Sequence, residues 1–334
     1  MVHLTNGDAA VAVLRAAELA GSFLPWRDVL HEGPIPAELE LDDLSRVRAE
    51  FITACGWGRP EDTLRQFQTR DAALRASAAE DEVVLWFESD LYDQLQLCQV
   101  LAWYHAQSSK PARLSRISVD KDPEDGQFRG LGATKPDRIR ALFESRTPVT
   151  LDQLATGARA WDALRLPEPT ALDALRRAGT PALPELAPAL ERLLSELPAE
   201  QNGLSRTEQT ALTAVIEGAR APAEIFVAVH TKEDRPFMGD WSFWRVLARL
   251  ATGAKPLMEL ASGARPRFPP EVPAAAAFGA QRFRLTQTGR DVQAARADAV
   301  ATNGIDRWVG GTHLRQDGRV WRWNGAAGKL VPPK

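Results

Sequence analysis

Short apolar runs alternate with longer segments of helical periodicity over roughly the first 120 residues. The short runs predict strands at 2–5, 22–26, 82–87 and 114–119. The longer segments predict helices at 9–20, 42–54, 60–78 and 91–105, the first of them capped by Asp8. Strands separated by helices imply crossover connections, so the pattern predicts an α/β fold with an N-terminal Rossmann-like parallel sheet.

Only helical patterns follow between 135 and 197. Pro136 predicts the start of a helix that runs to 143, because proline suits the first helical turn. Thr150 and Gln153 match a capping box, in which each side chain bonds the backbone N–H of the other residue. Leucines form one stripe over 182–197, where Pro188 would kink the helix or delay its start. This helical middle either completes the first domain or bridges the two halves.

A new pattern begins after a linker signal at 198–203. Ser205 and Glu208 match a second capping box, Pro222 opens a second helix, and Asp240 can cap a third. These helices are followed by strands at 256–260 and 282–286 and by a helix at 291–298. Three helices, a strand pair and a further helix are the order of a winged-helix domain.

The C-terminal tail carries a hairpin signal. Asp317 and Gly318 lie between the runs 311–314 and 320–323, and an Asp-Gly pair favours a tight hairpin turn. The patterns together divide the chain into a Rossmann-like domain (1–125), a helical segment (126–198), a winged-helix-like domain (199–302) and a β-hairpin tail (303–334).

The composition is that of an ordinary globular protein. The chain has 334 residues, with 41 basic and 44 acidic side chains, and 44% of its residues are hydrophobic. This excludes collagen-like and wholly disordered chains. No apolar run approaches the ~20 residues that span a bilayer, and the N-terminus has no secretory pattern. Two cysteines, Cys55 and Cys98, are too few for a disulfide framework. We therefore expect a cytoplasmic protein of bacterial type with no membrane partner.

The net charge of −3 conceals an asymmetry. Residues 205–334 contain 19 Lys and Arg against 12 Asp and Glu, a net charge of +7, whereas residues 1–204 carry −10. This difference predicts that the two halves meet different partners or meet each other.

Polar residues follow three of the predicted strands, and ligands bind beyond the carboxyl ends of strands in an open parallel sheet. If these loops converge, they can hold a polar ligand or support acid–base chemistry, with His31 as the natural proton carrier. The candidate catalytic residues are Asp8, Asp28, His31, Glu32, Glu88 and Asp90. The candidate ligand-binding residues are Thr5, Asn6, Gly7, Arg27 and Gln94. The alternative is that the aspartates act as helix caps or turn residues and that His31 is an exposed loop histidine.

Several familiar motifs are absent. The chain has no phosphate-binding P-loop and no dinucleotide fingerprint, and Gly130-Leu131-Gly132 matches the latter weakly and in the wrong place. The five histidines are scattered, so we predict no histidine metal site. No metal and no cofactor is assigned from the sequence, although carboxylates can gather Mg²⁺.

Four arginines are candidate nucleic-acid contacts. Arg245 and Arg249 lie four residues apart, on one face of the third helix of the winged-helix pattern. Arg282 and Arg284 lie beside the expected wing, and such guanidinium groups contact phosphates. The alternative is that aromatic residues of this helix belong to the core, that the arginines form a solvated face, and that the domain contacts proteins.

Three stretches resemble one bacterial family. They are Leu4–Asp8 (LTNGD), Leu24–Pro34 (LPWRDVLHEGP) and Trp86–Leu95 (WFESDLYDQL). The family is defined by domain of unknown function 1835, and the match covers about the first 120 residues. Stretches at 202–208, 236–240 and 303–308 resemble its longer members. The resemblance implies no established activity and carries over no catalytic role, but it implies that the motif loops are family features and favours a shared site.

Three functions fit these observations. The first is a binding or regulatory protein, with a small polar ligand in the α/β crevice and nucleic acid or a protein against the basic half. The second is a hydrolase or transferase that uses the Asp/Glu/His cluster. The third is an intramolecular scaffold or protein-interaction module, in which the basic half docks on the acidic half.

Overall fold

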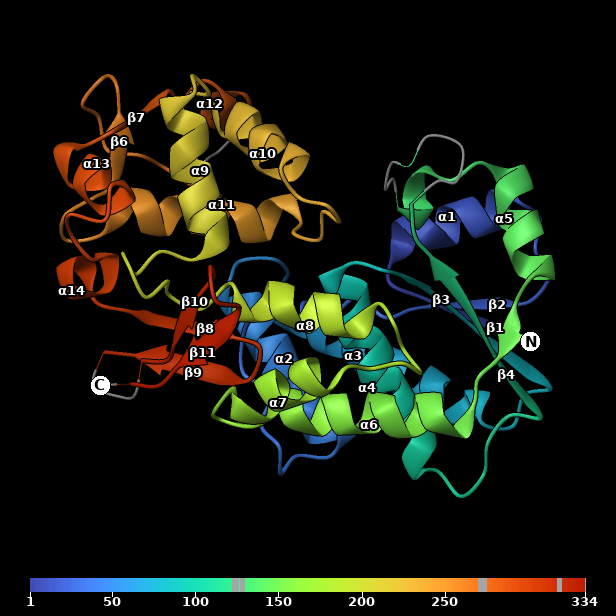
Figure 1. The fold of residues 1–334 in the computed structure, drawn as a ribbon. Helices are drawn as coiled ribbons and strands as arrows, with labels where there is room; N and C mark the ends of the chain where they lie inside the picture. The colour runs from blue at the N-terminus through green and yellow to red at the C-terminus, as the bar shows by residue number, and fades with distance from the viewer. Residues whose placement is uncertain (122–125, 127–129, 270–274, 317–319, 334) are drawn as a thin grey trace. The chain divides into compact units, whose positions relative to one another are not determined.

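The computed structural model describes residues 1–121, 126, 130–269, 275–316 and 320–333. The chain forms two compact units (Figure 1). The first unit comprises residues 1–54, 58–190 and 310–312, and the second comprises 55–57, 191–309 and 313–334. The predicted turn at Asp317 and Gly318 lies outside the described residues.

A five-stranded sheet forms the centre of the first unit, in the order β2-β1-β3-β4-β5. Its strands are β1 (Val2–Thr5), β2 (Ser22–Pro25), β3 (Glu82–Glu88), β4 (Arg113–Val119) and β5 (Thr147–Pro148). The first four are parallel, which confirms the prediction of an α/β fold with a mostly parallel sheet. β5 pairs antiparallel with β4, so the expectation of helices alone between 135 and 197 is wrong. Two residues are too few to show the period of a strand.

Helices cover both faces of this sheet (Figure 1). They are α1 (Asp8–Ala16), α2 (Leu41–Ala54), α3 (Pro60–Ser77), α4 (Leu91–Ala106), α5 (Pro136–Glu144), α6 (Leu151–Leu164) and α7 (Thr170–Ala178), with the short 3₁₀ helix η1 (Leu131–Ala133). The unit therefore has the layered architecture in which a parallel sheet is buried on both sides.

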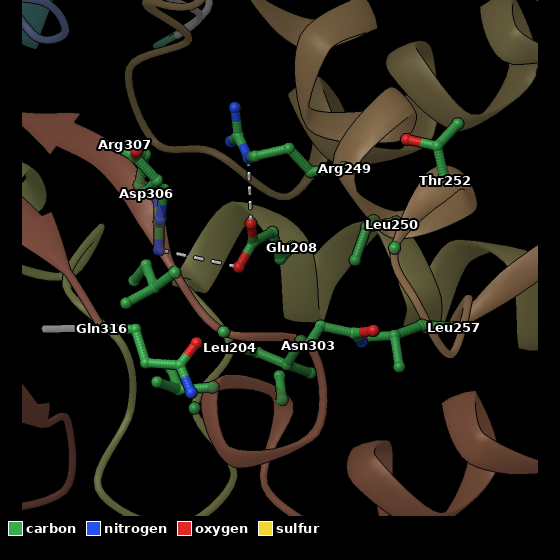
Figure 2. A pocket seen from close by; sticks show the side chains of 16 residues that line it. Leu204, Glu208, Arg249, Leu250, Thr252, Leu257, Asn303, Asp306, Arg307 and Gln316 are labelled. Atoms are coloured by element: carbon green, nitrogen blue, oxygen red, sulfur yellow. Dashed lines mark hydrogen bonds and ion pairs between the residues drawn. The ribbon is translucent and has the colours of Figure 1, made fainter.

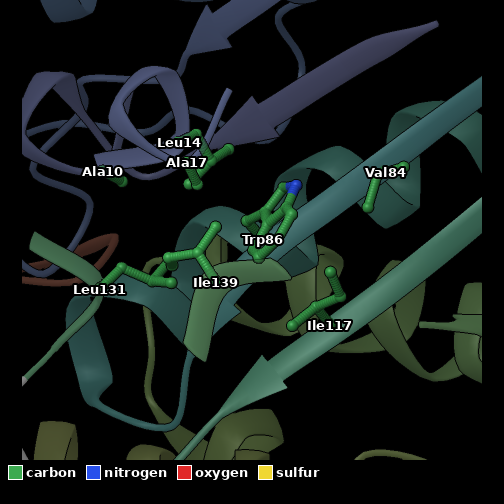
Figure 3. Packing of buried hydrophobic residues seen from close by; sticks show 8 residues of the cluster. All are labelled: Ala10, Leu14, Ala17, Val84, Trp86, Ile117, Leu131 and Ile139. Carbon is green, nitrogen blue, oxygen red and sulfur yellow. The ribbon is translucent and has the colours of Figure 1, made fainter. Parts of the chain in front are cut away.

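All seven residues of β3 are buried, because it is the central strand and its alternate side chains serve the two faces. On one face, Val84 and Trp86 pack with Leu14 of α1, Leu131 of η1 and Ile139 of α5 (Figure 3). The segment that follows residue 130 is therefore part of the hydrophobic core of the sheet.

α4 packs against β3 and against α6. The contact with α6 is close: a Cβ at Gly157 would lie 2.6 Å from the Cβ of Leu101. Most of α4 is buried, including its first turn, as expected for a helix covered on several sides. This packing fixes the first turn of α4 directly after the carboxyl end of β3.

The helix ends follow the sequence signals in part. The capping box of Thr150 and Gln153 is confirmed at the start of α6. The expectation that Asp8 caps α1 is wrong: Gly7 is the cap, and the Asp8 side chain bonds Arg27 instead. α8 (Leu186–Leu194) begins later than the predicted position 182, so Pro188 falls in its first turn, where its missing N–H costs nothing.

The second unit contains three helices followed by a strand pair and shorter helices. These are α9 (Arg206–Ile216), α10 (Pro222–Thr231), α11 (Asp240–Thr252), β6 (Met258–Leu260), α12 (Ala275–Gly279), β7 (Phe283–Leu285), α13 (Gln287–Gln293) and α14 (Ala299–Asn303). β6 and β7 pair antiparallel. The predicted capping box of Ser205 and Glu208 is confirmed at α9, and Pro222 opens α10 as predicted. Gly239, not Asp240, is the cap of α11.

Two expectations for the C-terminal region are wrong. The predicted helix 291–298 is interrupted: α13 ends at Gln293, Ala295 has a positive φ of 54°, and Asp298 caps α14. The runs 311–314 and 320–323 do not pair with each other. β8 (Asp306–Val309) pairs with β9 (Thr312–Arg315), and β10 (Arg322–Asn324) pairs with β11 (Lys329–Val331). Each strand thus pairs with the neighbour to which the shorter loop joins it, because closing a shorter loop costs less entropy.

Among the described residues, no helix is both long and apolar enough to cross a membrane.

Candidate functional site

Three buried carboxyl groups meet where β3 ends and α4 begins. Glu88 is the last residue of β3, Asp90 caps α4, and Asp93 lies in its first turn. The Asp93 N–H donates to the Asp90 carboxylate at 3.1 Å. One oxygen from each carboxyl lies within 4.8 Å of the others. We call Glu88, Asp90 and Asp93 the carboxyl cluster.

Backbone and amide donors hold this cluster in place. Asn6, which follows the neighbouring strand β1, donates through its Nδ2 to Glu88 Oε1 at 3.2 Å and to Asp93 Oδ1 at 2.8 Å. The Glu88 N–H donates to Asp93 Oδ2 at 2.6 Å. The pairing of β1 with β3 therefore brings Asn6, far away in the sequence, against both carboxylates.

Gly130 and Leu131 approach Glu88 from a third segment. The Leu131 N–H donates to Glu88 Oε1 at 2.6 Å. A Cβ at Gly130 would lie 2.8 Å from Glu88 Oε2, and the φ of Gly130 is +69°. Both the space and the backbone conformation thus require glycine at this position.

Burial and mutual repulsion govern the charge of the carboxyl cluster. Burial raises the pKa of Glu88. Burial and the charge of Glu88 raise the pKa of Asp90 to about 8. Burial, followed by the charges of Asp90 and Glu88, raises the pKa of Asp93 well above its usual range. Three like charges this close need protons or a bound cation to compensate them.

The other buried carboxyl groups have arginine partners. Six further Asp and Glu side chains are buried among the described residues. Each forms an ion pair with arginine: Asp28 with Arg48, Asp71 with Arg70, Glu82 with Arg146, Asp173 with Arg176, Glu196 with Arg192, and Glu208 with Arg249 and Arg307. Within the described part of the chain, no cationic side chain pairs with the carboxyl cluster.

Gln94 adds a further oxygen beside the cluster. Its Nε2 donates to the backbone carbonyl of Glu88 at 2.7 Å. Its Oε1 is buried and has no hydrogen-bond partner among the described residues. An amide oxygen and carboxylate oxygens are the ligands that hard divalent cations prefer in proteins.

Asp28 lies in a separate buried ion pair. Its Oδ1 accepts from Arg48 Nε at 3.0 Å, and Arg70 lies 3.9 Å from its Oδ2. Arg48 also donates to the carbonyls of Val29, Glu32 and Pro34, so it holds the loop that follows β2. These contacts give the buried Asp28 a structural role, because the guanidinium of Arg48 binds its Oδ1 and the carbonyls of the loop, although Asp28 Oδ2 has no hydrogen-bond partner among the described residues.

His31 and Glu32 lie in the same loop. His31 is buried, with its Nε2 3.9 Å from Glu32 Oε1. Its ring lies edge-on to Tyr92, with 6.4 Å between the ring centroids. Burial raises the pKa of Tyr92, and the charges of Asp93, Asp28 and Asp90 add to this effect. Tyr92 therefore lies between the Asp28 ion pair and the carboxyl cluster.

The remaining predicted residues lie at the edge of the site. Asp8 and Arg27 form a bidentate ion pair on the surface, at 2.6 and 2.7 Å. The Thr5 hydroxyl donates to the Gly7 carbonyl, and a Cβ at Gly7 would meet no atom within 4 Å. Open space at Gly7 borders the half-buried Asn6, which contacts the carboxyl cluster.

The structure thus brings together Asn6, Glu88, Asp90 and Gln94 of the predicted set. It places Asp8 with Arg27 and Asp28 with Arg48 in two separate ion pairs. Sequence reasoning left Asp93, Gly130 and the Leu131 N–H out of the site. The spacing Glu88-x-Asp90-x-x-Asp93 was a usable signal, because a cap and the third residue of a helix lie close together.

The four arginines of the second unit contact residues of that unit. Arg245 contacts the Cys55 sulfur and lies 5.5 Å from the centroid of a Trp57 ring. Arg249 donates to Glu208 at 3.4 Å. Arg282 and Arg284 are exposed; the first donates to the carbonyls of Gly279 and Gln281, and the second pairs with Glu259 at 2.9 Å.

Comparison with known proteins adds no relative to these observations. No protein-family model matches the chain, and no curated protein matches it.

Proposed function

We propose that this protein is a binding protein whose α/β unit takes a small cationic ligand, a divalent cation, at the carboxyl cluster. One observation carries the proposal: Glu88, Asp90 and Asp93 are buried together without a cationic partner among the described residues, whereas six other buried carboxyl groups have arginines. The buried Oε1 of Gln94, which has no hydrogen-bond partner among the described residues, supports the same conclusion, because the Nε2 of the same amide bonds the Glu88 carbonyl.

The position of the cluster also supports ligand binding. It lies at the carboxyl end of the central strand, where open parallel sheets bind ligands. The three carboxylates favour a cation over the phosphate group that a helix N-terminus would otherwise attract. Mg²⁺, Mn²⁺ and Ca²⁺ all take carboxylate and amide oxygens as ligands.

Binding is better supported than hydrolysis or group transfer. The enzyme hypothesis requires Asp8, Asp28, His31, Glu32, Glu88 and Asp90 to act in one pocket. Asp8 and Asp28 have arginine partners of their own, and Arg48 holds Asp28 as part of a loop. The carboxyls that remain together form a ligand set without a base–nucleophile pair.

We also propose that α9, α10, α11, β6 and β7 form a winged-helix-like domain. The order of these elements and the antiparallel pairing of β6 with β7 support this assignment. Nucleic-acid binding through Arg245, Arg249, Arg282 and Arg284 stays a prediction. Membership of the family of domain of unknown function 1835 is likewise a proposal, supported by the three motifs at 4–8, 24–34 and 86–95.

The test is a titration of the full chain with Mn²⁺. Binding is measured by electron paramagnetic resonance, as the loss of the signal of the free ion. We expect one site in the wild-type protein. D93N removes one negative charge but keeps an oxygen that can accept from the Glu88 N–H, so it should weaken binding about tenfold or more. D137N changes an exposed aspartate of α5 and serves as the matched control.

Equal Mn²⁺ affinity in D93N and D137N would contradict the proposal. So would the absence of binding by the wild-type protein at ~10 mM Mn²⁺, a concentration that detects even weak sites. The carboxyl cluster would then hold shared protons and have a structural role. Circular dichroism of each variant shows whether the fold is retained.

A further inference from the structure

The second unit contains a pocket of about 430 Å³. Residues of α9, α11, α14 and β8 line it, and Figure 2 shows Arg249 and Arg307 pointing toward Glu208. Leu204, Leu250 and Leu257 contribute apolar surface. This volume and this mixture of a few charged groups with apolar walls are typical of small-molecule sites.

Glu208 pairs with both arginines of this pocket. It is buried, and its two oxygens lie 3.4 Å from Arg249 Nε and 3.7 Å from Arg307 Nη2. Burial opposes ionisation of Glu208, but the charges of Arg307 and Arg249 outweigh it and lower its pKa. Asp306 also lines the pocket, but its exposed carboxylate bonds His313 at 2.7 Å. Among the described residues, Arg249 and Arg307 therefore share Glu208 as their ion-pair partner.

Arg307 has unused hydrogen-bond donors. Its side chain is 11% exposed, close to the 10% of Arg192 in the same unit. Arg192 donates to Glu196, Glu233, Ser195 and Thr207. Arg307 donates no hydrogen bond to any described residue, and its single ion pair is long. A guanidinium group has five N–H donors, and leaving them unsatisfied away from water is costly.

Arg249, which contacts the other oxygen of Glu208, also has N–H donors without an acceptor among the described residues. Its contact with Glu208 at 3.4 Å is its one hydrogen bond among the described residues, and its side chain is 32% exposed. The neighbouring Asn303 is not available to a ligand in the same way, because it bonds both the N–H and the carbonyl of Lys255. The two arginines are thus the charged groups of this pocket with donors to offer.

We propose that this pocket binds a small organic anion, through a carboxylate or phosphate group held by Arg307 and Arg249. Such groups accept two parallel hydrogen bonds from one guanidinium, and a bound anion gives the two arginines that share Glu208 a second acceptor. The apolar wall formed by Leu204, Leu250 and Leu257 fits the body of the ligand. This site is independent of the carboxyl cluster and of its cation.

Calorimetric titration of the full chain with succinate and with inorganic phosphate tests the proposal, in a buffer of physiological ionic strength. We expect saturable binding of at least one of them, and the one that binds identifies the anionic group. R307Q should weaken this binding about tenfold or more, because it removes the charge and most of the donors. The matched control is R282Q, which replaces an exposed arginine outside the pocket and should bind the anion as the wild type does.

E208Q tests the same proposal in the opposite direction. Glutamine also completes a capping box, so the start of α9 is retained while the competing carboxylate is removed. We expect E208Q to bind the anion more tightly than the wild type. If R307Q does not fold, tighter anion binding by E208Q than by the wild type still supports the proposal. Unchanged affinity in E208Q, or no saturable binding by either protein up to about 10 mM of both anions, would overturn the proposal.

Discussion

At the scale of single residues, Gly130 and Leu131 approach Glu88 with backbone atoms only. The Leu131 N–H bonds Glu88 Oε1 at 2.6 Å, which is a charge-assisted contact when Glu88 is ionised. Gly130 is the residue that makes this approach possible, since any side chain there would meet Glu88 Oε2. The geometry of the carboxyl cluster thus depends on a residue that carries no functional group.

Replacement of Gly130 by alanine should destabilise the protein more than the same change at Gly179. Both glycines combine a positive φ, +69° and +79°, with a ψ of 162°, a region that is essentially confined to glycine, so alanine is strained in both by about 1–3 kcal/mol. A Cβ at Gly179 meets nothing within 4 Å, whereas one at Gly130 lies 2.8 Å from Glu88. We expect G130A to lose about 1 kcal/mol more than G179A. Urea denaturation measures the free energy of unfolding of G130A and G179A. Equal losses of stability in the two variants would show that the contact with Glu88 is unimportant.

Residue identities near strand ends predicted part of the candidate site. Asn6, Glu88 and Asp90 could be named because polar residues directly follow predicted parallel strands. Their separation from Asp28 could not be predicted, because it depends on Arg48, which lies twenty residues further along in another helix. Nothing in the local pattern marks Arg48 as a buried partner instead of a surface arginine of a charged helix.

At the scale of elements, helix and strand types and most helix starts followed from periodicity and caps, while the break between α13 and α14 and the strand pairing after residue 303 did not. The four parallel strands and the capping boxes at Thr150 and Ser205 were predictable because these signals span only a few residues. The break between α13 and α14 was not, because it depends on the Asp298 carboxylate, which caps α14 and also pairs with Arg322.

The proposed winged-helix-like domain leads to a prediction about its arginines. Arg249 is engaged with Glu208, whereas Arg282 and Arg284, beside and within β7, are exposed. If nucleic acid contacts this domain, R282A/R284A should lower the retention of the full chain on duplex DNA and reduce its salt slope by about 2, since each phosphate contact contributes about 1.

Retention should be measured across a salt series, with R46A in α2 as a control for an exposed arginine of the first unit. Absence of wild-type retention even at low salt would remove nucleic acid as a partner. A loss of retention as large in R46A as in R282A/R284A would assign the effect to overall charge and not to the wing.

At the scale of the whole molecule, buried acids have arginine partners in both units, and the carboxyl cluster is the exception among the described residues. Arg192 in the second unit contacts Glu196 and Glu233, forming a network of complementary charges. Burial alone would raise the pKa of Glu196, but the Arg192 charge and the Thr207 hydrogen bond lower it to about 2. The carboxyl cluster of the first unit has no such partner among the described residues.

The network around Arg192 predicts how acid acts on the second unit. The pKa of Glu196 is about 2 in the folded state, below its ordinary value of 4.5, so ionised Glu196 stabilises the fold above pH 4.5. That contribution is lost as the pH falls from 4.5 towards 2. The stability difference between the wild type and E196Q should therefore shrink over this range. Urea denaturation at a series of pH values measures it, with E217Q, an exposed partner of Lys232, as the control.

A stability difference between the wild type and E196Q that stays constant from pH 5 to about pH 2 would contradict this prediction. For E217Q the difference from the wild type should stay below about 1 kcal/mol at every pH, since an exposed ion pair contributes little.

Apolar periodicity and helix caps, which act over a few neighbouring residues, were enough to predict three features: the α/β fold with its mostly parallel sheet, most helix starts, and the polar character of the loops after β1, β2 and β3. The partners of the buried charges became known from the folded chain: Arg48 for Asp28, Arg192 for Glu196, two arginines for Glu208, and none of the described cationic residues for the carboxyl cluster. The physical reason is that Coulomb and hydrogen-bond energies depend on distance and burial in space, and residues from separate elements meet only after the chain has folded.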